Sequence, residues 1–304
     1  MRAPLAAALL ALSVAQTGCI KQMLLDGQIE ATRKASAAVD TISDYEVAQS
    51  AAFAGIAQFE GMHYLAPDNE DALFMLTKSW AGATFGFIED LMEQAEDAQG
   101  SDSPLYAYEQ ARARAGYDRA IHYGVELLEH KNKGFSAAKR NDETMKAWLS
   151  KFTDKDDAAA LFWTGNAWMS KTNVIKEDPA AVAELFVGVD MMERAVALDP
   201  GYMNGSGFIA LGAYHARSPL AELPEGKKDF DKAIAMTGGK YLMAKFQLAA
   251  KYYCTKGDKD AYVKTLTEVV QAGDVFPEER LTNTIAKRRA SRYLTKPRMR
   301  ACGF

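Results

Sequence analysis

The sequence predicts an all-α protein, on three observations. Apolar residues recur at helical spacing through most of the 304 residues. Runs that alternate apolar and polar residues, as a half-buried strand does, are almost absent. Turn and capping residues, such as "APDNED" (66–71) and "AQGSDSP" (98–104), divide the chain into pieces of about one helix each. We therefore expect an array of helical hairpins.

The N-terminus predicts export. The first eighteen residues, "MRAPLAAALLALSVAQTG", contain Arg2 followed by an apolar run that is shorter than the roughly 20 residues of a spanning helix. The following Cys19 resembles the acylated cysteine of a bacterial lipobox, with Gln16 where leucine is usual. We expect a lipoprotein-type signal peptide (1–18), lipid attachment at Cys19 and a single α-helical domain (19–304). The alternatives are cleavage at a different small residue and an uncleaved helix.

Pairs of aromatic residues spaced six apart recur along the chain. They are Phe74 with Trp80, Tyr117 with Tyr123, Phe162 with Trp168, Phe208 with Tyr214, and Phe246 with Tyr252. On a helix, residues six positions apart point in directions about 120° apart, so the two aromatic residues of a pair would contact two different neighbouring helices. The first helix of a stacked hairpin has two such neighbours. This favours a superhelical array of about five degenerate hairpins similar to tetratricopeptide repeats (TPR), with capping helices from about 20 to 64 and from about 277 to 294.

The stretch 72–92 is apolar enough to suggest a membrane span. Lys78, Glu89 and Asp90 interrupt it, and its aromatic residues fit the repeat. We expect a buried hairpin helix there.

A superhelix of hairpins has a concave face, which aromatic residues can line. Most aromatic and methionine side chains must belong to the core, but those on the concave face would form an apolar cleft for a lipid-like ligand or a partner segment. The candidate cleft residues are Trp80, Phe85, Trp163, Trp168 and Tyr214.

Arg289 is predicted to lie on the apolar face of the last helix. At 100° per residue, Arg289 falls between the apolar positions Ile285 and Tyr293. A buried guanidinium group needs a carboxylate or carbonyl partner. Arg289 is therefore expected either in an internal ion pair that joins the last helix to the array, or as an anion contact in a groove.

Several function classes lack support in the sequence. A net charge of −4 and a pI near 5.7 disfavour nucleic acid as a partner. We find no nucleophile elbow, phosphate-binding loop or acid–base carboxylate pair, so no enzyme and no cofactor are predicted. The four histidines are scattered and no Cys/His spacing predicts a metal. Cys254 and Cys302 could pair, or Cys254 could be a buried free thiol.

Longer segments carry a family resemblance. "RARAGYDRAIHYGVELLE" (112–129), "GGKYLMAKFQLAAKYYC" (238–254) and "FPEERLTNTIAKRRASRYL" (276–294), together with Cys19, resemble the TatT family. This family is the T component of TPR-associated tripartite ATP-independent periplasmic (TRAP) transporters. The likeness covers nearly the whole mature chain.

The resemblance implies a periplasmic, membrane-anchored lipoprotein that forms a homotrimer. It implies binding to the cognate substrate-binding (P) component and an apolar cleft for a hydrophobic small molecule, in an accessory role without chemistry on the solute. The alternative is a general TPR scaffold lipoprotein for cell-envelope assembly.

Overall fold

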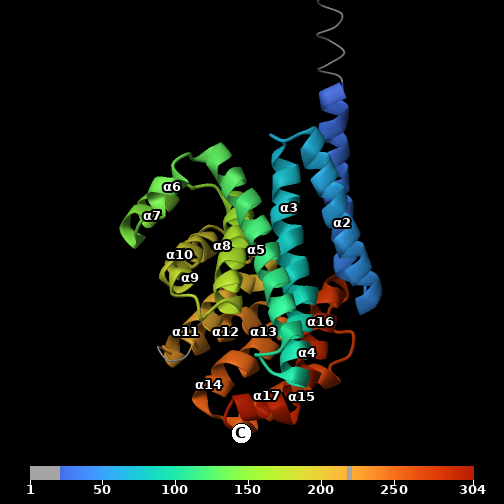
Figure 1. Ribbon diagram of the computed structural model, residues 1–304, viewed down its shortest axis with the longest axis vertical. Helices are drawn as coiled ribbons and strands as arrows, with labels where there is room; N and C mark the ends of the chain where they lie inside the picture. Colours follow the sequence, from blue (N-terminus) through green and yellow to red (C-terminus); the bar gives the residue numbers. More distant parts are fainter. Residues whose placement is uncertain (1–20, 218–220) are drawn as a thin grey trace, which may run out of the picture.

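The structure is a computed structural model that describes residues 21–217 and 221–304. Every regular element in these residues is helical, which confirms the all-α prediction (Figure 1). The expected signal peptide and Cys19 lie outside the described residues. The expected N-terminal helix is interrupted. A helix over residues 21–35 and the 3-10 helix η1 (Ser36–Thr41) come before a separate helix, α2 (Tyr45–Leu65). Asp44 starts α2 by accepting a hydrogen bond from the Val47 N–H.

The helix after α2 runs without a break through three elements, α3 (Glu70–Ala83), the π-helical η2 (Thr84–Ile88) and α4 (Glu89–Gln99). It packs along α5 (Pro104–Lys131), which Ser103 caps. Over residues 21–217 and 221–304, no helix is both long enough and apolar enough to cross a membrane. The apolar stretch 72–92 is instead buried inside the protein.

The middle of the chain forms a second helix pair. Two short helices, α6 (Phe135–Ala138) and α7 (Asp142–Leu149), lead to α8 (Asp157–Val174). After α9 (Pro179–Ala183), α10 (Leu185–Leu198) packs closely against α8. A Cβ atom added at Gly165 of α8 would lie 2.9 Å from the carbonyl oxygen of Gly188 in α10, so this approach requires a glycine.

The remaining helices complete the array. The short η3 (Tyr202–Gly205) precedes α11 (Ser206–His215), which packs against α12 (Leu223–Met236). One helix then comprises α13 (Leu242–Gln247), the π-helical η4 (Leu248–Tyr253) and α14 (Cys254–Lys256), and it packs against α15 (Lys259–Gln271). The chain ends with η5 (Pro277–Glu279), α16 (Arg280–Tyr293) and α17 (Lys296–Ala301).

The repeat differs from the expected five hairpins. In the described part of the chain, four packed helix pairs follow one another: α3–α4 with α5, α8 with α10, α11 with α12, and α13–α14 with α15. Tyr117 and Tyr123 lie on α5, which is the partner of α3, so the first two aromatic pairs belong to one helix pair. The leading aromatic of all five pairs is buried, as a helix between two neighbours requires.

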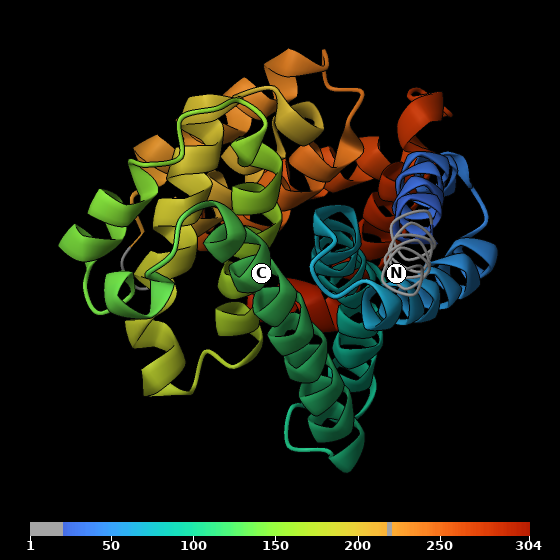
Figure 2. The same cartoon turned by 90° about the horizontal axis from the view of Figure 1, so that it is seen from above.

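The last helices close the array into a ring. Helix α16 packs against α13 and α15, and also against η1 and α2 from the beginning of the chain. Viewed from above, the helices surround a central region (Figure 2). A disulfide between Cys254 and Cys302 ties the end of the chain back to α14. The two thiols that the sequence left open are therefore paired.

Candidate functional site

A cavity of about 830 Å³ lies inside the ring of helices. Its walls come from both halves of the chain, including α2, α3, η2, α8, α11, α13 and α16. This volume falls in the usual range for small-molecule sites, roughly 300 to 1,000 Å³. The apolar part of the wall includes Phe59, Phe85, Phe162, Trp163, Met243 and Ile285. The cavity is thus large enough for an organic ligand.

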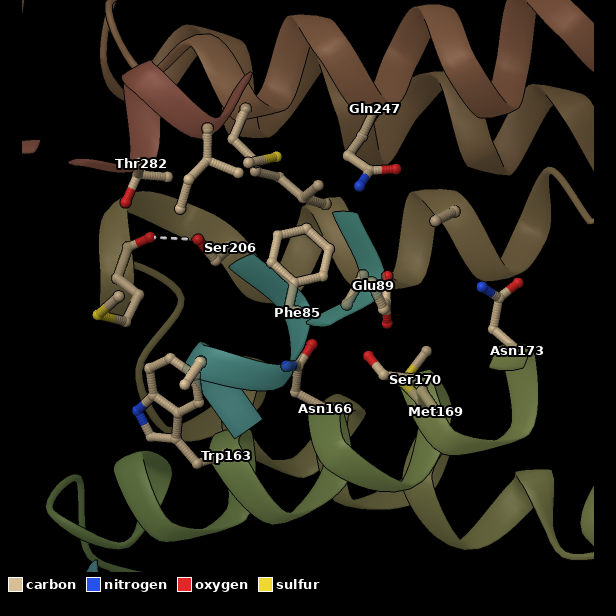
Figure 3. Close-up of a pocket in the computed structure, with 18 of the residues that line it drawn as sticks. Phe85, Glu89, Trp163, Asn166, Met169, Ser170, Asn173, Ser206, Gln247 and Thr282 are labelled. Carbon is tan, nitrogen blue, oxygen red and sulfur yellow. Dashed lines mark hydrogen bonds between the residues drawn. The ribbon is translucent and has the colours of Figure 1, made fainter. Parts of the chain in front are cut away.

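Three of the five aromatic residues proposed for an apolar cleft line this cavity: Phe85, Trp163 and Tyr214 (Figure 3 shows the first two). The other two lie elsewhere. The Trp80 indole N–H donates a hydrogen bond to Glu60 at 2.9 Å, and the Trp168 ring packs edge-on against Phe135 with ring centres 5.8 Å apart.

Both π-helical segments border the cavity. Segment η2 contributes Phe85, and η4 contributes Ala250 and Lys251. A π-helical turn contains one more residue than an α-helical turn and so rotates the side chains that follow it, and such turns are frequent at functional sites. Here they place an aromatic ring and an ammonium group in the wall of the same cavity.

One end of the cavity is polar. Asn166, Ser170 and Asn173 form a stripe along α8, and Gln247 and Lys251 face the cavity from α13 and η4. In Figure 3, Trp163 lies on one side of Phe85, while Ser170, Asn173 and Glu89 lie on the other. Sequence reasoning missed these residues. Their spacing of three or four positions on otherwise apolar helices is the signal that would have found them.

Arg289 is almost fully buried, at 2% exposure, and also borders the cavity. Its Nη2 atom lies 3.0 Å from the Glu89 carboxylate and 2.8 Å from that of Glu93. The guanidinium group stacks over the Phe85 ring, 4.6 Å from the ring centre. The geometry therefore contains the internal ion pair that the sequence suggested as one role for Arg289, and the carboxylates come from α4.

Arg289 belongs to a larger ionic cluster between α4 and the last two helices. Arg288 donates to Asp90 at 2.8 Å, and Arg292 is paired with both Asp90 and Glu93. Arg298 of α17 lies 2.6 Å from Asp97 and 2.8 Å from Glu96. We call these residues of α4, α16 and α17 the ionic seam. It holds the last helices against the first helix pair.

Burial and charge act in opposite directions within the ionic seam. Burial would raise the pKa of Glu93, but the positive charges of Arg289, Arg292 and Arg298 outweigh it and lower this pKa to about 2. For Glu89, burial outweighs the attraction of Arg289, and the pKa is raised. The Tyr117 hydroxyl donates a hydrogen bond to the Glu89 carboxylate. Glu93 is therefore the firmly ionised partner of Arg289.

The side chains that line the cavity suit binding. Aromatic and aliphatic groups make up much of the wall, and amide, hydroxyl and charged groups lie among them. In Figure 3, Ser206 and Thr282 lie on the Trp163 side of Phe85, and Ser170 and Asn173 lie on the other. Within residues 21–217 and 221–304, no group of three His, Cys, Asp or Glu side chains is arranged to hold a metal ion.

Comparison with known proteins supplies the family. No curated protein sequence matches the chain. The model of one protein family, described as the TRAP transporter T-component, matches residues 41–299. The match covers the four helix pairs, both π-helical segments and the arginine residues of α16. The chain therefore belongs to the TatT family, the T components of TRAP transporters.

Proposed function

We propose that the protein is a periplasmic lipoprotein that serves a TRAP-type uptake system as an accessory component. It binds the cognate substrate-binding component and holds a hydrophobic molecule in the cavity, and its helix pairs act as a TPR-like scaffold. The lipid anchor is Cys19, which keeps the protein at the membrane where the transporter works. Family membership supports the transport role.

The observation that carries the ligand part of this proposal is the cavity itself. A scaffold for cell-envelope assembly is expected to fill the interior of its helix array with side chains. Here about 830 Å³ remain open beside Phe85 and Trp163. Concave spaces of roughly 300 to 1,000 Å³ with mostly apolar walls are typical of small-molecule sites, so a space of this size favours a ligand site.

The test is isolation of the full-length, C-terminally tagged protein from its native membranes, followed by mass spectrometry of proteins and extracted small molecules. Recovery of a periplasmic solute-binding protein together with a hydrophobic compound is the expected result. Recovery of envelope-assembly proteins without a solute-binding protein would favour the scaffold instead. The protein is also proposed to form a homotrimer, and light scattering of the purified mature chain tests this by measuring its molar mass.

A matched pair of variants on α2 tests whether the cavity holds the compound. Gly55 lines the cavity and Gly61 is exposed on the same helix; a Cβ atom added at either has no neighbour within 4 Å. Gly55→Leu should abolish co-purification of the compound, and Gly61→Leu should leave it unchanged. Equal recovery with both variants would show that the compound binds outside the cavity.

A further inference from the structure

Two lysine side chains at the polar end of the cavity have no direct ion-pair partner among the described residues. Lys251 lies in the cavity wall within η4, and Lys176 lies at its edge just after α8. Among the described residues, no carboxylate comes within 4.0 Å of either ammonium group, and neither group takes part in a side-chain hydrogen bond. The two cations thus lie at a cavity surface without ion-pair partners.

The nearby carboxylates are already engaged. Glu89 and Glu93 also line this end of the cavity, but both are paired with Arg289, and Arg292 binds Glu93 as well. Each of these two carboxylates already has a guanidinium partner within 3.0 Å, and neither lies within 4.0 Å of the Lys251 ammonium group. The ionic seam therefore stabilises the helices and leaves Lys251 for another anion.

Uncharged hydrogen-bonding groups line the same cavity as Lys251. Gln247 precedes it by one helical turn, and Asn166, Ser170 and Asn173 face the cavity from α8 (Figure 3). The Gln247 Oε1 atom is buried and has no hydrogen-bond partner among the described residues. Buried polar groups in proteins are normally paired, so this acceptor oxygen indicates a missing donor, whereas the side-chain NH2 group of Gln247 is the part that can donate to an anion.

The polar end also reaches the surface. Asn166 and Ser170 are half-buried, whereas Asn173 and Lys176, further along the same stripe, are exposed. Phe85 lies between this stripe and Trp163, and the two aromatic rings give the cavity wall an apolar part further inside. A ligand that fits both parts has a hydrophobic body and one polar group near the opening.

We propose that the cavity binds an amphipathic organic anion whose charged group contacts Lys251 and the amides of Gln247 and α8. This proposal rests on the hydrophobic-ligand site proposed above and adds the chemical class of the ligand. Burial lowers the pKa of Lys251, and an anion beside the ammonium group would offset this effect by stabilising the charged form. The carboxylate of a fatty acid and a monoalkyl phosphate share this chemistry.

The test measures displacement of cis-parinaric acid, a fluorescent polyene fatty acid, from the delipidated mature protein. The competitors are hexadecanoate, hexadecyl phosphate and the uncharged hexadecanol, which share one hydrocarbon chain. We expect at least one anion to displace the probe about tenfold more strongly than the alcohol, the advantage of a charge-assisted hydrogen bond. Preference for carboxylate or phosphate identifies the source of the anion.

Variants of Lys251 test the contact itself. Lys251→Met keeps most of the side-chain stem and removes the charge, so it should weaken anion binding about tenfold and leave hexadecanol unchanged. Lys251→Arg should preserve the preference for anions. The control is Lys264→Met, which removes an exposed lysine of α15 that does not line the cavity. Thermal melts check that each variant is folded.

Three outcomes would overturn the proposal, and they differ in meaning. If anion and alcohol bind equally and Lys251→Met changes neither, the charged-group contact is absent, while the hydrophobic site stands. If only the alcohol binds, the ligand class is wrong. If no competitor displaces the probe, or the probe itself does not bind, the amphipathic anion is excluded, and the Gly55→Leu experiment decides separately whether the cavity binds another hydrophobic molecule.

Discussion

The Nη2 atom of Arg289 lies 2.8 Å from the Oε1 atom of Glu93, a residue 196 positions earlier in the chain. Both side chains are largely withdrawn from solvent, at 3% and 12% exposure. The contact joins the penultimate helix to the first helix pair and so lies where the ring of helices closes.

Arg289→Ala should lower the free energy of unfolding by about 3 to 5 kcal/mol, because it leaves buried carboxylates without their partner. Urea melts measure the change. The control is Arg280→Ala on the same helix, which removes an exposed pair with Asp274 and should cost less than about 1 kcal/mol. A loss below about 1 kcal/mol for Arg289→Ala would exclude the buried pairing.

The disulfide should stabilise the protein by constraining the unfolded chain. Cys254 and Cys302 are 48 positions apart, and a crosslink over this separation is worth about 2 to 4 kcal/mol. Urea melts with and without reductant should differ by this amount. The double variant Cys254→Ser/Cys302→Ser should have the unfolding free energy of the reduced protein, and adding reductant should not change it. Equal stability of the oxidised and reduced protein would contradict the expectation.

Asp190 predicts a dependence of stability on pH. Burial raises its pKa to about 6 despite Lys146 nearby, and its Oδ2 atom has no partner among the described residues. The folded-state pKa exceeds the ordinary value of 3.8, so the folded protein holds the Asp190 proton more tightly than the unfolded chain does. Protonated Asp190 therefore stabilises the fold at low pH, and this stabilisation is lost as pH rises from about 4 to about 6.

Asp190→Asn removes this titration. Relative to the unchanged protein, the variant should gain about 1 to 2 kcal/mol at pH 7.5 compared with pH 4, a range discounted from the full shift of about 3 kcal/mol. Urea melts of both proteins across this range measure the difference. If the two proteins lose stability in parallel over the whole range, Asp190 is not the group responsible.

Gly124 allows the close approach of α5 to α8, and a larger residue should not fit there. A Cβ atom at this position would lie 2.2 Å from the Thr164 hydroxyl oxygen, so Gly124→Ala should cost about 1 to 3 kcal/mol in unfolding free energy. Adding Thr164→Ala should restore most of the loss. Gly61→Ala, on an open face of α2, should instead gain up to about 1 kcal/mol. An unchanged melt for Gly124→Ala would show that the helices move apart readily.

Cys19→Ser tests the lipid anchor. The serine variant cannot be acylated, so the protein should move from the membrane fraction to the soluble periplasmic fraction after cell breakage. Immunoblots of the two fractions measure the change. Retention of the variant in the membrane fraction would contradict anchoring through Cys19.

The sequence predicted much of the fold because helical periodicity is a local property. The helix boundaries follow capping residues, such as Asn69 before α3 and Ser103 before α5. The angular position of Arg289 on its own helix indicated burial correctly. The partner was not predictable, because a helical pattern does not say which distant element it faces. The acidic stripe of Glu89, Glu93 and Asp97 lies some 200 positions away.

The cavity was harder to predict from the sequence for the same reason. Trp80 and Trp163 are both aromatic residues on long helices, yet only Trp163 lines the cavity. Which face points inward depends on how the ring closes, and that closure is made by α16. Lys251 was missed because a single lysine in an apolar helix has no distinct local pattern until Gln247 is considered with it.

The closure of the ring limits how this protein can change during evolution. Open solenoids grow and shrink by tandem duplication or deletion of a unit, because each unit touches only its neighbours. Here α16 must reach α4, so gaining or losing one helix pair would carry Arg289 away from Glu89 and Glu93. Point substitutions in the cavity wall remain available, and we expect members with this seam to differ in cavity lining rather than in number of helices.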